Sequence, residues 1–366
     1  MQIRETRRRN SWKIELFEDD RSISWCSVID CRIRIGASVV TMGGIGGVGT
    51  LREFRRQGYS RQVMEAALAM MERERYGISL LHGIQDFYHH FGYVTCMAEH
   101  EFSLATRDAE RCGRSGAKTR RLKTGDLPAI ARLYNRDNAA RTGSAVRDPR
   151  RWRGFRKGTW WSTPAATQVV VDGRDRIIGY VVYDDIGNFC RAAEIGGLGE
   201  PVFTAILDFL ARRAIKLRLE RVWVNAPSDH PFAIYCRDFG LRLNSLYPRN
   251  ERSMGRIIDF RTCIESALPT LARRWGHDQR GLRLAIRTDA GGGTLSWRDE
   301  QLILEEGVHG RCVRLNQEQL MQLLMGYARP SDLKGLGRMT VPAKQQELLE
   351  RLFPLQHAQL WWPDRF

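Results

Sequence analysis

IGGVGTLREFRRQGYSRQVMEAALAMMERERYGISLLHGIQDFYHHFGY, residues 45–93, is the stretch that decides the fold of this chain. Its Gly-rich apolar start, residues 45–50, predicts a strand, and a basic loop follows from Arg52 to Ser60. Apolar residues then recur at helical spacing from Val63 to Met71, and Gly77 is placed to end that helix. A glycine-containing loop at a helix start exposes backbone N–H groups, which predicts a site for a phosphorylated ligand.

The glycines of this stretch permit a second interpretation. Gly44 to Gly49 spell a literal G-x-G-x-x-G, the fingerprint of a dinucleotide-binding turn. That fingerprint requires the helix to open at the glycines and an acidic residue about 20 positions later. Here the basic loop separates the glycines from the helical pattern, so a coenzyme loop at Arg55–Ser60 is the better match.

The loop residues Arg55–Ser60, RRQGYS, resemble a known coenzyme loop. They are similar to the Q/R-x-x-G-x-G/A motif of the GNAT acetyltransferase superfamily, with Ser60 in the last small position. The run YHHFGY at residues 88–93, beyond the helix, strengthens the match. The resemblance implies acetyl-CoA as co-substrate. The coenzyme-binding residues that it implies are Val48, Gly49, Thr50, Arg55, Arg56, Gln57, Gly58, Tyr59, Ser60, Arg61, Ile84 and Gln85.

Length and composition limit the class of protein. At 366 residues the chain is too long for one ordinary domain, and its 43% apolar fraction is enough for ordinary cores. The formal charge of +16 would suit nucleic-acid binding, but the basic residues are spread along the chain and most are arginine. We therefore expect no nucleic-acid partner. An electropositive surface that attracts a polyanionic cofactor fits the charge equally well.

The sequence predicts a cytoplasmic protein without a metal or a membrane partner. No run approaches the roughly 18 apolar residues of a membrane span, and the charged start is not followed by the apolar segment of a signal peptide. The eight cysteines lack C-x-x-C spacing, which favours free thiols over disulfides or a zinc site. His89 and His90 are adjacent, so they do not share a face that could bind a metal.

Strands are expected on both sides of the helix. Residues 12–17, 22–35 and 39–50 read as successive strands, and residues 78–82 as the strand after the helix. Residues 84–91 read as a short helical segment and 93–105 as a further strand. The strand and two helices that usually open a GNAT fold have almost no room before Trp12. The resemblance also implies that the fourth and fifth strands splay apart, so that the thioester enters between residues 48–50 and 83–85.

Tyr88 has two interpretations. As an aromatic residue in a short helical segment, it could simply pack in the core. The resemblance implies that it is the general acid that protonates the departing thiolate, and a phenol with a pKa of about 10 can donate to a thiolate of similar basicity. We expect Phe87, Phe91 and Tyr93 in the core.

A second unit repeats the order of elements after a polar linker, residues 108–117. Its expected elements are a strand at 118–122, a helix with Pro128 in its first turn, a hairpin of 168–171 and 177–184, a loop at 194–201, a helix at 202–210, a strand at 222–225 and an echo of 88–92 at 234–240. This order indicates an internal duplication. Glu200 and Pro201 stand where Arg and Gly should meet a pyrophosphate. A carboxylate repels a pyrophosphate, and proline lacks the N–H donor that would bind it. We expect the fold there without the coenzyme site.

Residues 253–366 read as a third domain. The expected elements are a helix at 257–271, strands at 282–288, 293–297 and 302–305, a helix at 317–325 capped by Asn316 with Gln319 in capping-box position, and a helix at 344–352. This pattern resembles the sterol-carrier-protein-like domain. We therefore predict an α/β (α+β) chain. It has tandem GNAT folds, with mixed, mostly antiparallel sheets and flanking helices, at 1–107 and 118–252, followed by a sterol-carrier-like α+β domain at 253–366.

This arrangement resembles the enhanced intracellular survival (Eis) family of acetyltransferases over nearly all of the chain. The resemblance implies an N-acetyltransferase that moves the acetyl group of acetyl-CoA to a primary amine, such as an aminoglycoside, a polyamine or a lysine side chain, and a homo-hexamer. It assigns the general acid to Tyr88 and the general base to the C-terminal carboxylate, here that of Phe366. Two departures concern the acceptor: the short N-terminal segment, and a His82–Tyr88 segment that is one residue tighter than usual.

Several alternatives stay open from the sequence. We expect direct transfer in a ternary complex, because no cysteine lies beside a base in the motif and Cys96 falls in a strand after it. Phe366 could be an aromatic anchor without chemistry, and the base could then be Asp86, His89 or His90. The chain could also be a non-catalytic module that binds coenzyme A or a lipid.

Overall fold

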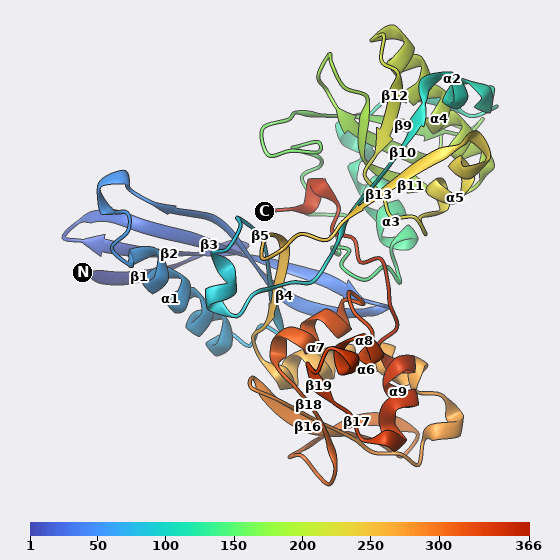
Figure 1. The fold of residues 1–366 in the computed structure, drawn as a ribbon. Helices are drawn as coiled ribbons and strands as arrows, with labels where there is room; N and C mark the ends of the chain where they lie inside the picture. The colour runs from blue at the N-terminus through green and yellow to red at the C-terminus, as the bar shows by residue number, and fades with distance from the viewer.

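The computed structural model describes all residues, 1–366, as three units that each contain one β-sheet (Figure 1). The first sheet has seven strands in the order β1-β2-β3-β4-β5-β14-β6. The second has seven in the order β13-β7-β12-β11-β10-β9-β8, and the third has five in the order β17-β16-β15-β18-β19. Most neighbouring strands are antiparallel, and helices flank the sheets (Figure 1). The predicted fold class is therefore confirmed.

The first sheet opens with an antiparallel series of strands: β1 (Gln2–Arg8), β2 (Ser11–Glu18), β3 (Arg21–Ile35) and β4 (Ser38–Thr50). The expectation that a strand and two helices have almost no room before Trp12 was wrong for the strand, because β1 pairs with β2 along its whole length. It was right for the helices, since none lies between β1 and β2. β1 is charged and almost entirely exposed, so it lacks the apolar alternation by which a strand is recognised in sequence.

The predicted helix is confirmed as α1 (Tyr59–Arg73), which follows the single-turn 3-10 helix η1 (Arg52–Phe54). Its buried side chains include Val63, Met64, Ala67 and Met71, which pack on the first sheet. The chain then forms β5 (Ile78–Gly83), which runs parallel to β4. The strand–loop–helix–strand order is therefore the one that the sequence predicts.

The glycine run lies inside β4, so the dinucleotide interpretation was wrong. The pairing of β3 with β4 passes from Trp25↔Gly49 to Ser27↔Gly46, so β4 has one extra residue there, a β-bulge. Gly47 has φ +60 at this bulge, a conformation that favours glycine. The bulge lies at the end of β4 that leads into the basic loop.

The segment after β5 differs from its prediction. Only residues 88–91 form a helix, the 3-10 helix η2 (Tyr88–Phe91), because Asp86 has a left-handed backbone, φ +53, that interrupts a regular helix. The expected strand at 93–105 is two strands, β6 (Val94–Thr95) and β7 (Glu99–Ala105). β6 belongs to the first sheet and β7 to the second, so the chain changes sheets between them.

The first and second units exchange strands. β7 pairs with β12 and β13 in the second sheet, whereas β14 (Arg252–Ile257) pairs with β5 and β6 in the first sheet. The domain bounds at 107 and 252 stay a prediction, but the sheets cross them. The two units therefore share hydrogen-bonded strands and cannot rotate freely about a linker.

The second unit keeps the predicted order of elements with shifted bounds. Its elements are α2 (Thr106–Ala109), η3 (Glu110–Cys112), β8 (Lys118–Arg121), η4 (Thr124–Asp126), α3 (Leu127–Asp137), β9 (Ala165–Val171), β10 (Ile177–Asp184), β11 (Arg191–Gly197), α4 (Glu200–Lys216), β12 (Arg221–Val224), α5 (Pro231–Cys236), η5 (Arg237–Phe239) and β13 (Leu241–Leu246). The loop expected at 194–201 is mostly strand and helix, and only Leu198 and Gly199 lie between β11 and α4. The residues expected as a linker, 108–117, include the short helices α2 and η3.

The third unit packs below the first in Figure 1. Its elements are α6 (Phe260–Trp275), η6 (His277–Gln279), β15 (Leu284–Thr288), β16 (Gly291–Arg298), β17 (Gln301–Glu306), β18 (Cys312–Leu315), α7 (Gln317–Leu324), α8 (Pro330–Gly335), β19 (Met339–Thr340), η7 (Ala343–Gln345) and α9 (Gln346–Leu352). The last element, η8 (Trp362–Asp364), lies in the C-terminal tail and packs on the second unit. The capping box of Asn316 and Gln319 is confirmed. The likeness to a sterol-carrier domain stays a prediction.

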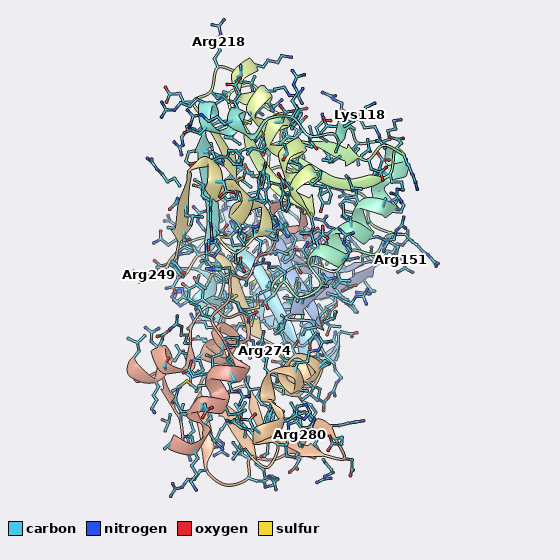
Figure 2. The ribbon with its side chains drawn as sticks, turned by 90° about the vertical axis from the view of Figure 1, so that its right-hand side faces the viewer. Lys118, Arg151, Arg218, Arg249, Arg274 and Arg280 are labelled. Atoms are coloured by element: carbon cyan, nitrogen blue, oxygen red, sulfur yellow. The ribbon has the colours of Figure 1, made fainter.

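The basic side chains labelled in Figure 2, from Lys118 to Arg280, lie on different sides of the second and third units and form no single stripe. All eight cysteines are free thiols. No helix has the length and apolar character that crossing a membrane requires.

Candidate active site

The candidate site begins where β4 and β5 stop pairing. Their parallel register ends at Ile45↔Leu81, although β4 continues to Thr50 and β5 to Gly83. The predicted splay between the two strands is therefore present. Past Ile45, the edge of β4 that faces β5 has no strand partner, so its backbone groups remain free for a ligand.

A cleft of about 510 Å³ lies on the loop side of this splay. It is lined by the residues Val48, Gly49, Thr50, Phe54, Arg55, Arg56, Gly58, Tyr59, Ser60, Arg61, Ile84, Phe87, Tyr88, His90 and Phe91. Ten of the predicted coenzyme residues are thus brought together in one cavity. Gln57 and Gln85 are not among the lining residues, and the Gln57 amide instead donates to the Glu53 carbonyl at 3.3 Å.

The geometry of this cleft fits the pyrophosphate of a coenzyme. α1 starts at Tyr59 with no side-chain cap, and its first turn lines the cleft, so backbone N–H groups are available to an anion. Gly58 has φ +80, and a Cβ built on it meets nothing within 4 Å. Arg55, Arg56 and Arg61 add positive charge around the same opening.

Tyr88 lies between the cleft and the core. Its side chain is 9% exposed, and its ring contacts the rings of Phe87 and Tyr93 at centroid distances of 4.9 and 6.4 Å. Burial raises the pKa of Tyr88 to about 12, so the phenol keeps its proton at neutral pH. Packing and proton donation are therefore compatible at this position.

The C-terminal residue reaches the opposite face of the splayed strands. A Cβ built on Gly44 would lie 2.7 Å from two ring carbons of Phe366, and one built on Gly46 would lie 3.1 Å from the terminal carbon of Phe366. Strand alternation puts Ile45, which packs among the α1 core residues, on the other face. The C terminus thus lies beside β4 and β5, between the first and second units (Figure 1).

The C-terminal tail, residues 359–366, is held by the second unit. Arg147, whose side chain is 2% exposed, binds the carboxylates of both Glu194 and Asp364, with nitrogen–oxygen distances of 2.5 and 2.9 Å to the closest oxygens. The Trp361 indole donates to the Asn138 side chain at 3.0 Å. These contacts come from the unit that the sequence predicts to lack a coenzyme site, and they fix the tail on which Phe366 is carried.

Sequence reasoning missed the residues around Arg365, which precedes Phe366 in the tail. The Arg365 guanidinium donates to Glu99 at 2.7 Å and approaches the His82 ring nitrogen at 3.4 Å, and the Lys157 ammonium donates to the Arg365 carbonyl. His82 also contacts the Trp161 ring at 5.6 Å. These residues come from β5, β7, the loop before β9 and the tail. No local motif links them, so no signal in the sequence could have grouped them.

Residues 2–96 match the family model described as an acetyltransferase (GNAT) domain. The protein is an acyltransferase. No curated protein matches the chain by sequence. The matched residues include strands β1 to β6 of the first sheet, α1 and the residues that line the cleft, and domains of this kind use acetyl-CoA as co-substrate.

Solved structures share the fold of this acyltransferase over nearly its whole length. A probable N-acyltransferase of unknown function from Enterococcus faecalis V583 has a TM-score of 0.77 at 17% identity, covering 98% of this chain and 90% of that chain. A GCN5-related N-acetyltransferase from Anabaena variabilis has 0.75 at 16%, covering 98% and 90%. Eis1 from Mycobacterium abscessus has 0.67 at 16%, covering 98% and 91%. At these identities the likeness establishes the fold alone.

Proposed function

We propose that this acyltransferase is an N-acetyltransferase that moves the acetyl group of acetyl-CoA directly to a primary amine in a ternary complex. The observation that carries the proposal is the position of Phe366. Its α-carboxyl group lies beside Gly46, where β4 and β5 separate, on the face opposite α1. Donor and acceptor can therefore approach the gap from opposite sides.

In this proposal the cleft side binds the donor. The uncapped start of α1 and the side chains of Arg55, Arg56 and Arg61 hold the pyrophosphate. The pantetheine arm then runs along β4 toward the splay. Free backbone N–H groups near Val48 and Gly49 stabilise the negative charge that develops on the acetyl oxygen.

The tail side supplies the base. An amine arrives as an ammonium ion, and the Phe366 carboxylate can pair with it and take its proton, directly or through water. The amine nitrogen then forms a bond to the acetyl carbon and the carbon–sulfur bond breaks. The second proton that the nitrogen loses passes through water to the Tyr88 oxygen, which has given its own proton to the departing sulfur, and the Phe366 carboxyl group releases the first proton to solvent. The sulfur takes the phenol proton of Tyr88, which burial keeps protonated at neutral pH.

Direct transfer is supported by the state of the thiols. Burial raises the pKa of Cys26 and of Cys31 to about 12, and it also raises the pKa of the fully buried Cys96. Thiols in this state are poor nucleophiles at neutral pH, because the thiolate is the reactive form. An acetylated cysteine on the reaction path is therefore not expected.

The test is a two-substrate kinetic analysis with a panel of primary amines and mass analysis of the products. Ternary-complex transfer gives intersecting double-reciprocal lines and an N-acetylated amine, whereas parallel lines or an acetyl-cysteine peptide would contradict it. Acetyl-CoA binding without turnover of any amine would favour a non-catalytic coenzyme-binding module. Assembly as a homo-hexamer belongs to the same proposal and is checked by light scattering.

A further inference from the structure

An exposed aromatic surface lies beside the C terminus. We call it the tryptophan face and define it by Trp160, Trp161, Trp362 and His82. The Trp362 ring contacts those of Trp160, Trp161 and His82 at centroid distances of 5.7, 5.8 and 5.4 Å. Trp160 is 51% exposed and Trp161 39% exposed, whereas Trp362 is buried. The indole rings of Trp160 and Trp161 are thus held against the buried Trp362 ring, with part of their area open to solvent.

The tryptophan face lies on the acceptor side of the splayed strands. In the β4–β5 register Gly44 pairs with Leu80, and strand alternation puts His82, two residues after Leu80, on the same face of the sheet as Gly44 and Gly46. That is the face on which the Phe366 carboxyl group lies. The Lys157 ammonium ties the two together, because it lies 4.1 Å from the Trp161 ring centre and donates to the Arg365 carbonyl.

The carboxylates around this face leave a single anion without a cationic partner, and it can bind one ammonium group. Glu99 is bound by Arg365 at 2.7 Å and by Ser253 at 3.0 Å, and Asp364 is bound by Arg147. The Phe366 α-carboxylate therefore remains as the anion that an amine can use.

The other ionisable groups do not attract a second cation. Burial lowers the pKa of His82 to about 4, with Arg365 the largest contribution from a neighbouring charge, so His82 is neutral at pH 7. Burial also lowers the pKa of Lys157 to about 8, which leaves most of it cationic at pH 7. Arg252 and Arg156 lie within range of His82 and Lys157 respectively, and each lowers its neighbour's pKa.

We infer that the tryptophan face binds the body of the acceptor and that the acceptor is a monoamine with a flat aromatic body, such as an arylalkylamine. The inference rests on the proposed acetyl transfer. A planar apolar group gains area burial and ring contacts on two exposed indoles. A polyamine or an aminoglycoside would instead bring further ammonium groups toward Lys157 and Arg365, which repel them.

The experiment compares 2-phenylethylamine, n-butylamine and spermidine as acceptors for the full-length protein. We expect kcat/KM to be at least about tenfold higher for 2-phenylethylamine than for spermidine, since each ring contact is worth about 1 kcal/mol. Trp160→Ala and Trp161→Ala should each raise the KM for 2-phenylethylamine about fivefold to tenfold, with little change in the dissociation constant of acetyl-CoA.

Tyr247→Ala is the matched control, because Tyr247 is a 58% exposed aromatic residue whose ring contacts that of Tyr327 and none of the rings of the tryptophan face. It should leave all three acceptors unchanged. Lys157→Gln should raise the kcat/KM for spermidine relative to 2-phenylethylamine by removing one repelling charge. Calorimetry of 2-phenylethylamine binding to each variant gives a readout that does not require turnover.

Two results would overturn the inference while leaving the proposed function intact. One is a kcat/KM for spermidine equal to or above that for 2-phenylethylamine. The other is tryptophan variants that bind and use 2-phenylethylamine like wild type. Failure of every amine to be acetylated, despite acetyl-CoA binding, would instead overturn the proposed function, and the acceptor assignment would fall with it.

Discussion

Substituting Gly44 tests the position of the C-terminal carboxylate without altering the tail itself. An alanine methyl at this position would lie 2.7 Å from two ring carbons of Phe366. Carbon atoms in ordinary contact are about 3.5–4.0 Å apart, so the ring, or the strand under it, must shift by about 1 Å. Misplacement of this size can cost about 10²-fold in rate. We therefore expect Gly44→Ala to lower kcat about 10- to 100-fold while acetyl-CoA binding is preserved.

Gly43→Ala is the matched control on the same strand. Its methyl would lie 2.4 Å from the Met71 sulfur and 3.0 Å from Val28, on the face that α1 covers, and would not touch the tail. Both variants overpack the protein, which costs about 1–3 kcal/mol. Gly46→Ala is an intermediate case, because its methyl would lie 3.1 Å from the terminal carbon of Phe366, a contact that a shift of a few tenths of an ångström relieves.

The assay measures kcat at saturating amine, the dissociation constant of acetyl-CoA by calorimetry and the urea midpoint of each variant. The reasoning requires turnover to fall in the order wild type, Gly46→Ala, Gly44→Ala, with Gly43→Ala close to wild type despite a lower midpoint. If Gly43→Ala slows turnover as much as Gly44→Ala, the loss reflects stability and not the carboxylate. Undiminished turnover in Gly44→Ala would mean that Phe366 is an anchor without chemistry.

Four further predictions concern the base, the coenzyme, the tail and pH. Deleting Phe366 or adding a C-terminal tag should lower kcat at least about tenfold with acetyl-CoA binding intact. Full activity of a tagged enzyme would mean that another residue is the general base. Gly58→Asp should fold, because its side chain enters open space and aspartate is one of the few residues that tolerate the left-handed backbone of this position, but lose acetyl-CoA binding; calorimetry of the wild type should give one site per protomer. Arg147→Met should lower the free energy of unfolding by about 3–5 kcal/mol, because it strands two carboxylates, and a loss under 1 kcal/mol in urea denaturation would contradict this. The free energy of unfolding should fall as the pH drops from about 6.5 toward 4, because burial lowers the pKa of three histidines in the folded protein and the unfolded chain then binds more protons. Urea midpoints at pH 7, 6 and 5 measure this loss. The histidines concerned are His82, His100 and His230.

The cleft that we propose for the donor was predictable because its information is local. The pyrophosphate site needs a strand end, a glycine and a helix start close together in sequence, and Val48 to Arg61 contain all three. Interpretation from local sequence was wrong where one feature, a run of glycines, can have two different structural causes. The glycines at 44–49 resemble a nucleotide turn, but two of them admit Phe366 and one forms a bulge. What those positions require is visible only when the C terminus is placed against them.

The face that we propose for the acceptor was not predictable beyond Phe366 itself. His82 gives no special signal in β5, and its neighbours Trp161, Glu99 and Arg365 reach it only because β7 crosses to the second sheet and the tail returns past it. The sequence of the second unit indicates a lost coenzyme loop at Glu200 and Pro201. It does not indicate what that unit does instead.

The buried ion pairs suggest why the second unit keeps its fold. Arg147 lies inside the second unit with Tyr134 3.7 Å from its guanidinium, and it joins Glu194 of β11 to Asp364 of the tail. A surface contact of a terminal segment would fray, because the ordering of end residues opposes it. A guanidinium bound to two carboxylates out of water holds Asp364 two residues before the chain end. The second unit can thereby hold the C-terminal carboxyl group beside the splayed strands of the first unit, and the exchange of β7 and β14 joins the two units by hydrogen-bonded strands.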